Sequence, residues 1–109
     1  MLWASAIYGV ASLVHFVHNA EYLAEYPNMP QWISRPTVYG TWFGGFAIGV
    51  TGLGLGRTQI SPIGLLLVAI YATLGFDGLG HYALAPISSH SVVMNLTIGC
   101  EALAAGVLA

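Results

Sequence analysis

The hydrophobic residues of this chain form four long segments, separated by short polar segments that contain proline. The hydrophobic segments cover about residues 2–26, 37–56, 63–85 and 89–109. Each is long enough to cross the hydrocarbon core of a bilayer as a helix, which takes roughly 20 residues. Pro27 and Pro86 lie beside the ends of two segments, where proline prevents a helix from continuing. The pattern predicts one domain, residues 1–109, folded as an all-α, up-down four-helix bundle.

The composition favours an integral membrane protein. Hydrophobic residues make up 57% of the chain and charged residues 6%, and the mean hydropathy is +0.77. A soluble domain of this size needs more polar surface. The start of the chain has no basic segment of the kind that precedes a signal peptide's apolar core, so we expect the first segment to be a retained span. The only basic residues besides histidine, Arg35 and Arg57, are too few for a nucleic-acid surface.

The orientation depends on these two arginines, because basic loops tend to stay in the cytoplasm. Arg57 and the amino terminus are expected on one side and Arg35 on the other. We expect the cell (inner) membrane, with both termini in the cytoplasm. Tyr26 and Trp32 suit the headgroup zone, where aromatic rings gather.

The second hydrophobic segment is rich in glycine at spacings that let helices approach closely. This pattern fits either tight packing within the bundle or a face for a second copy of the chain. Residues 57–62 are expected to form the following turn. Cys100 has no CxxC partner and is expected to be a small core residue.

Most of the ionisable residues fall near the ends of the predicted spans that share one membrane face. In the first span, His15, His18, Tyr22 and Glu25 follow helical spacing and form one stripe, with Glu21 beside it. An ionisable side chain inside a bilayer costs roughly 2.5–3.5 kcal/mol on insertion scales. Several of them together indicate a partner, water, a metal ion or a proton path.

Two further spans carry matching residues. Asp77 and His81 are four residues apart, so the carboxylate is expected to orient the imidazole. In the last span, His90 and Glu101 share a stripe, with Asn95 beside it. With a rise of about 1.5 Å per residue, His15 and Glu101 should lie deepest in the membrane. Three helices are therefore expected to contribute to one interior site.

Four interpretations of this site stay open. Imidazole and carboxylate groups are ligands for zinc, copper, iron or manganese, and the candidate ligands are His15, His18, Glu21, His81, Asp77 and Glu101. Haem would need His15 or His18 opposite His81. Linked acids and histidines at graded depth also suit a proton or ion path. The fourth interpretation is a structural polar core. Additional polar candidates are Glu25, His90, Asn95 and Tyr22.

The leading functional hypothesis is an intramembrane site that binds a transition metal ion near one membrane face. The alternatives are an accessory subunit of a larger membrane complex, a proton-linked small-molecule transporter and a haem-binding protein. Besides lipid, we expect other membrane subunits or a homo-oligomer as partners. Whether the protein is an enzyme stays open, and no catalytic residue is assigned, because the chain lacks a nucleophile motif.

One short stretch resembles a known family. His18-Asn19-Ala20-Glu21-Tyr22, followed by a proline-containing loop and a glycine-rich span, is similar to small multi-span membrane proteins named for an HXXEE motif. Tyr22 stands where the motif has a second glutamate, and the similarity covers the first third of the chain. The resemblance implies a four-helix membrane protein in which His18 and Glu21 are important, and it implies no reaction.

Overall fold

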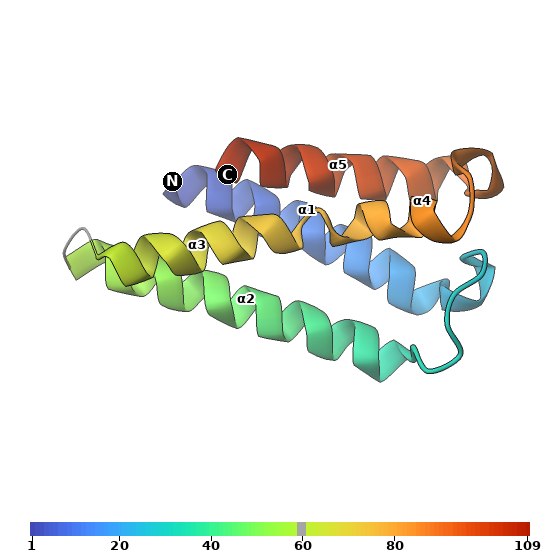
Figure 1. Cartoon of the computed structure of the whole chain (residues 1–109), viewed down its shortest axis with the longest axis horizontal. Coiled ribbons are helices and arrows are strands. Elements are labelled where there is room, and N and C mark those ends of the chain that lie inside the picture. The colour runs from blue at the N-terminus through green and yellow to red at the C-terminus, as the bar shows by residue number, and fades with distance from the viewer. Residues whose placement is uncertain (59–60) are drawn as a thin grey trace.

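The computed structural model describes residues 1–58 and 61–109, which contain helices and connecting turns and no strand. This confirms the predicted all-α bundle (Figure 1). The α-helices are α1 (Leu2–Glu21), α2 (Arg35–Thr58), α3 (Pro62–Leu74), α4 (His81–Leu84) and α5 (Val92–Leu108). Three 3₁₀ turns are η1 (Leu23–Glu25), η2 (Asp77–Gly80) and η3 (Ile87–Ser89). Of the expected turn at 57–62, residues 59–60 lie outside the described residues.

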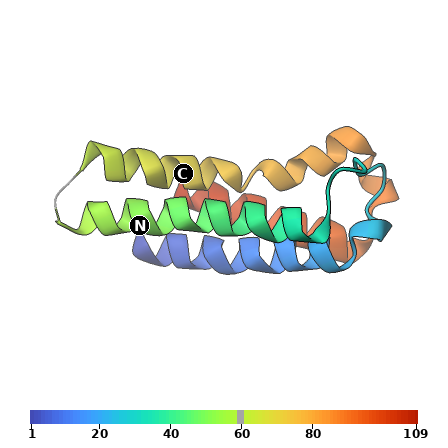
Figure 2. The ribbon, with the colours of Figure 1, turned by 90° about the horizontal axis from the view of Figure 1, so that it is seen from below.

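The helices run alternately up and down in a bundle of 45 × 24 × 19 Å. α1 packs mainly on α5, and α2 packs mainly on α3. Both views place the two termini near each other, while the α1–α2 and α4–α5 connections lie together at the opposite end (Figures 1 and 2). We call this opposite end the loop end. It is the end at which the polar residues were expected to gather.

The first helix is shorter than its hydrophobic segment. α1 ends at Glu21, because Tyr22 (φ −112°, ψ 27°) leaves the helical conformation. The turn η1 then brings Tyr26 back beneath the end of α1, where its side chain is buried. Of the two aromatic residues expected in the headgroup zone, Tyr26 is thus buried within the bundle, whereas Trp32 is 75% exposed.

The third predicted span is interrupted near its middle, where α3 ends at Leu74 and η2 and α4 follow. Gly75 explains the interruption, since a Cβ atom there would lie 2.5 Å from both Tyr8 and Ala105. The chain comes closer to α1 and α5 at this point than any other residue would allow. The last helix starts at Val92, with Ser91 as its N-cap, three residues later than the hydrophobic segment begins.

The glycines of α2 serve packing within the bundle at two positions. A Cβ atom at Gly49 would lie 2.5 Å from Tyr71, and one at Gly52 would lie 2.9 Å from Leu67. Gly40 and Gly44 have no neighbour within 4 Å of such an atom. Gly49 and Gly52 thus allow α2 and α3 to approach each other closely.

Polar and apolar side chains are distributed in an unusual way. The buried residues of α1 are Ser5, Tyr8, Ser12, His15, Asn19 and Ala20. Most of them are polar, Ala20 is apolar, and Tyr8 also packs in a hydrophobic cluster with Tyr71, Ala104 and Ala105. The exposed residues of the same helix include Leu2, Trp3, Ile7, Val10, Leu13, Val14 and Val17. Cys100 is exposed as well, against expectation.

Two segments of the described chain, Arg35–Gly56 and Pro62–Leu84, are helical, long and apolar enough to cross a membrane. Val92–Leu108 is a shorter apolar helix. α1 has the length of a span, at 20 residues, but its hydropathy is lowered by the buried polar residues that it carries.

Candidate functional site

The deepest part of the polar interior is a pair formed by α1 and α5. His15 Nε2 lies 3.6 Å from Glu101 Oε2, and both side chains are almost fully buried. His15 Nδ1 lies 3.3 Å from the hydroxyl of Thr97. The helical rise predicted that His15 and Glu101 share one depth, and this is confirmed. The pair can hold one proton, either as a carboxylic acid with a neutral imidazole or as a carboxylate with an imidazolium.

His81, at the start of α4, extends this pair toward the loop end. Its ring centroid lies 5.7 Å from that of His15, and Nε2 is 3.2 Å from Asn19 Nδ2. Since an amide nitrogen donates, Nε2 accepts and the proton of a neutral His81 is on Nδ1. The structure therefore pairs His81 with Asn19, and no hydrogen bond joins it to Asp77 among the described residues.

Tyr26 occupies the centre of the histidine cluster. Its hydroxyl is 2.9 Å from His18 Nδ1, and its ring lies 4.7 Å from the ring of His81 and 6.5 Å from that of His90. Burial raises the pKa of Tyr26 to about 12, so the phenol keeps its proton, and the tautomer of His18 decides which of the two groups donates in this hydrogen bond. Tyr22 stacks on the opposite side of His18 at 4.7 Å.

His90 completes the cluster at the loop end and is buried. Nδ1 lies 3.0 Å from the carbonyl oxygen of Pro86, which requires the proton to be on Nδ1. The rings of His81 and His90 are 6.1 Å apart. The hydrogen bonds of Asn95 to the carbonyls of Ile87 and His90 fix the turn that holds this ring.

The buried polar face of α1 continues from His15 toward the other end of the bundle. Ser12, Tyr8 and Ser5 follow at helical spacing and are all buried. Tyr71 of α3 joins them, with its ring 4.5 Å from that of Tyr8. From Ser5 to Asn19 this face covers about 21 Å of helix, at about 1.5 Å per residue. We call it the polar column.

Several buried polar atoms have no hydrogen-bond partner among the described residues. On the site these atoms are Asn19 Oδ1, His81 Nδ1, His90 Nε2 and both oxygens of Glu101, and in the rest of the column they are Ser5 Oγ and Tyr71 Oη. Leaving a buried polar atom unpaired costs about 1–3 kcal/mol. Buried polar atoms in proteins are satisfied by protein groups or by ordered water, so these atoms are the positions at which water or a ligand would be held.

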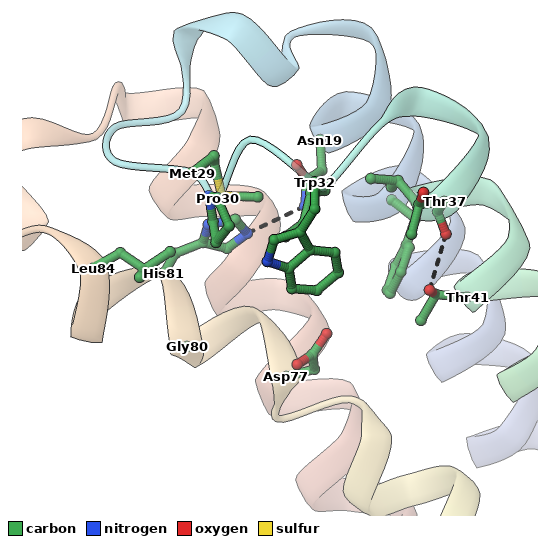
Figure 3. Close-up of a pocket in the computed structure, with 13 residues that line it drawn as sticks. Asn19, Met29, Pro30, Trp32, Thr37, Thr41, Asp77, Gly80, His81 and Leu84 are labelled. Atoms are coloured by element: carbon green, nitrogen blue, oxygen red, sulfur yellow. Dashed lines mark hydrogen bonds between the residues drawn. The ribbon is translucent and has the colours of Figure 1, made fainter.

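A cavity of about 370 Å³ lies beside the cluster, between α2, α4 and the α1–α2 connection (Figure 3). His81 and Asn19 form one side, Thr37 and Thr41 of α2 form another, and Asp77 lies below the indole of Trp32. The remaining lining is mostly apolar: Phe16, Met29, Pro30, Ile33, Val38, Gly80 and Leu84. The cluster and the cavity share His81.

The predicted site residues separate into two groups. His15, His18, His81, His90, Tyr22 and Glu101 come together in the cluster. Glu21 is exposed and pairs with Arg35 at 2.6 Å, and it accepts a hydrogen bond from Tyr39. Glu25 is exposed on η1, because the helix ends before it. Asp77 is an exposed residue of the cavity.

The predicted metal ligands do not meet at one point as the structure stands. Among residues 1–58 and 61–109, no three His, Cys, Asp or Glu side chains are arranged as a metal-binding group. The rings of Tyr26 and Tyr82 lie between or against the histidines. Metal binding therefore stays a prediction that requires side-chain movement.

Sequence reasoning missed three kinds of residue. Tyr26 was assigned to the headgroup zone, although its position after a helix end is where a chain can fold back. Asn19 was noted within a motif and not as the partner of His81. Ser5, Tyr8 and Ser12 were read as part of an apolar span, although their spacing with His15 was visible.

Comparison with known proteins finds no match for this chain: no family model, no curated protein and no solved structure is similar. The resemblance to the HXXEE proteins therefore stays a prediction. The function is argued from the residues of the chain itself.

Proposed function

We propose that this chain is an integral membrane protein that carries protons through its polar column, in linkage with a small molecule bound in the cavity. The distribution of side chains supports a lipid environment. Outward-facing residues such as Trp3, Val92, Leu103 and Val107 are apolar and between 74% and 81% exposed, and water would disfavour such a surface. The buried polar side chains are instead Ser5, Ser12, His15, Asn19, His81, His90 and Glu101.

The polar column is the observation that carries the proton role. Ionisable residues inside a membrane mark ion or proton paths when they are linked at graded depth. Here the column runs along α1 from Ser5 to Asn19, with the His15–Glu101 pair near its middle. The terminal half supplies hydroxyl groups and the loop half supplies imidazoles, and both kinds of group relay protons by hydrogen bonding.

Each member of the relay has a distinct part. Glu101 of α5 is the carboxylate that lies against the column among the described residues, beside His15, so it is the group that holds a proton at the deepest point. His15 exchanges that proton across 3.6 Å. His81 and His90 carry it toward the loop end, where their unpaired ring nitrogens need water or another donor to connect them.

His81 links the column to the cavity. Its neutral ring accepts from Asn19 Nδ2, so a second proton on the ring removes that acceptor. The amide of Asn19 then has to turn its oxygen toward His81, so that Oδ1 accepts from the protonated ring and Nδ2 points elsewhere. Asn19 also lines the cavity. Protonation of the cluster and occupancy of the cavity are thereby coupled through one amide group.

Proton movement in liposomes tests this function. Purified protein in vesicles that contain a pH-sensitive dye is expected to dissipate an imposed pH gradient. Glu101→Gln preserves shape and removes the ionisable group, so it should abolish the flux, whereas Glu25→Gln alters an exposed carboxylate and should leave the flux unchanged. Equal flux for Glu101→Gln and the parent would overturn the proposal, and no flux from folded parent protein would favour an accessory subunit.

Transition metal binding is the second candidate, and one observation favours it. His90 Nε2 is buried without a hydrogen-bond partner among the described residues, and because the His90 proton is on Nδ1 this nitrogen has a lone pair for a metal ion. The ring of His81 lies 6.1 Å from that of His90, and it would become a second ligand after loss of its Nδ1 proton or of its bond to Asn19. Glu101, beside His15, lies deeper in the same cluster. Elemental analysis of natively purified protein tests this: about one metal ion per chain, lost in His81→Ala, supports the metal site, and an absence of metal in the parent rejects it. An absorption spectrum of the same sample tests for haem.

A further inference from the structure

The cavity beside His81 has an unbalanced set of polar groups. Asp77 is the only formally charged side chain in its lining, and it makes no hydrogen bond among the described residues. Arg35, the arginine at this end of the bundle, is already paired with Glu21 at 2.6 Å. In a membrane an unpaired carboxylate is costly, so Asp77 requires a positive partner that the neighbouring residues do not supply.

Asn19 connects the wall of the cavity with His81. It is 92% buried and lines the cavity, and its Nδ2 atom is engaged with His81. Its Oδ1 atom is shielded from solvent, so Asp77 is the acceptor that a ligand in the cavity meets. A ligand that suits a carboxylate donates hydrogen bonds and carries positive charge.

The walls define the rest of the ligand. The indole of Trp32 lines the same cavity as Asp77 (Figure 3), and the face of an indole attracts a cation. Phe16, Met29, Val38 and Leu84 are apolar, so they favour an apolar body on the ligand. A volume of about 370 Å³ falls at the small end of the range for ligand pockets.

From these observations we propose that the cavity binds a small organic ammonium ion with an apolar or aromatic body. The ammonium group pairs with Asp77 and is attracted by the indole of Trp32, and the apolar body contacts the wall formed by α2 and the α1–α2 connection. This proposal names the ligand of the proposed function and rests on that function for the link to protons.

The geometry also gives the direction of the coupling between ligand binding in the cavity and protonation of His81. Groups that face His81 are His15 and Asn19 of α1, Tyr26, Asp77 of η2 and His90. A bound ammonium ion neutralises Asp77, which is the group at the cavity that would favour a proton on His81. The cation and the proton therefore compete, and binding of one releases the other.

Calorimetric titration of the full chain in nanodiscs, with empty nanodiscs as the blank, tests the ligand class. The probes are phenethylammonium and the neutral 2-phenylethanol, which share a body and differ in charge. We expect the parent to bind the ammonium ion at least tenfold more tightly than the alcohol. Asp77→Asn should remove this preference and keep the affinity for the alcohol, which also shows that the variant is folded. Glu25→Gln should change neither affinity.

Equal affinities of the parent for both probes, or no binding of the ammonium ion, would overturn the proposal. So would an Asp77→Asn variant that retains the preference. Trp32→Leu gives an independent measurement. Because Trp32 is 75% exposed, its loss should leave the fold intact and should weaken binding of the ammonium ion more than binding of the alcohol. A pH indicator in the same titration separates the two proposals: binding without proton release would contradict the linkage to His81 and leave the cation site standing.

Discussion

Tyr26 organises the cluster more than any of the predicted ligands does. Its hydroxyl bonds to His18, and its ring packs against His81 and His90. A single aromatic residue thereby contacts three histidines and holds one of them by a hydrogen bond.

Tyr26→Phe is expected to lower the free energy of unfolding by about 1 kcal/mol, the usual contribution of a side-chain hydrogen bond. The ring packing remains, so the fold should persist. Thermal or denaturant unfolding in detergent measures the change. Tyr22→Phe is the matched control, because the Tyr22 ring stacks on the same histidine and its hydroxyl makes no hydrogen bond among the described residues. An equal loss in both variants would contradict the role given to Tyr26.

The interruption between α3 and α4 determines where the site forms. Broken helices in membrane proteins place backbone and small residues against a binding site. Here Gly78 lies against the buried pair, since a Cβ atom there would be 3.1 Å from Glu101 Oε2 and 3.3 Å from His15 Nε2. The missing side chain at this position is what gives the pair its room.

Gly78→Ala is expected to displace the His15–Glu101 pair and to destabilise the protein by about 1–3 kcal/mol, as overpacking of a core does. The His15 imidazole signals in an NMR spectrum should shift, and the unfolding transition should move to lower denaturant. Gly80→Ala, two residues away, has no atom within 4 Å of its new Cβ and should leave both observations unchanged. Identical spectra for Gly78→Ala and the parent would show that the close approach is absent.

Much of the helix pattern was predictable from the sequence. Long apolar segments bounded by proline gave the order and number of the main helices, and helical rise alone paired His15 with Glu101. Tertiary contacts decided the rest. The break at Gly75 depends on Tyr8 and Ala105, residues far away in the chain. The predicted role of Asp77 assumed an unbroken helix, and the interruption instead exposes it in the cavity.

The molecule as a whole has its polarity arranged in reverse of a soluble bundle. Apolar side chains cover the outside of α1 and α5, and the interior contains histidine, serine, asparagine and glutamate. The exposed ion pair of Glu21 and Arg35 lies near the loop end, where a helical bundle in a bilayer meets the headgroups. This arrangement is consistent with a lipid environment for the whole bundle.

Leu103→Lys tests the proposal that the outer face of α5 contacts lipid. Leu103 is 74% exposed on α5, and a lysine facing the middle of a bilayer is expected to cost about 2.5–3.5 kcal/mol of insertion free energy. The membrane-integrated fraction in an insertion assay should fall accordingly. Glu25→Lys, which places the same charge at the loop end, should insert as the parent does. Unchanged insertion of Leu103→Lys would indicate that α5 faces water or another subunit.

The most direct measurement is infrared difference spectroscopy of the full protein in lipid, recorded as the pH is stepped across the neutral range. The proposed function predicts a carboxyl band that changes with pH, disappears in Glu101→Gln and persists in Glu25→Gln, because Glu101 is the buried group that gains and loses a proton. A carboxyl band that stays constant at every pH, or one that survives in Glu101→Gln, would contradict a proton path through the His15–Glu101 pair.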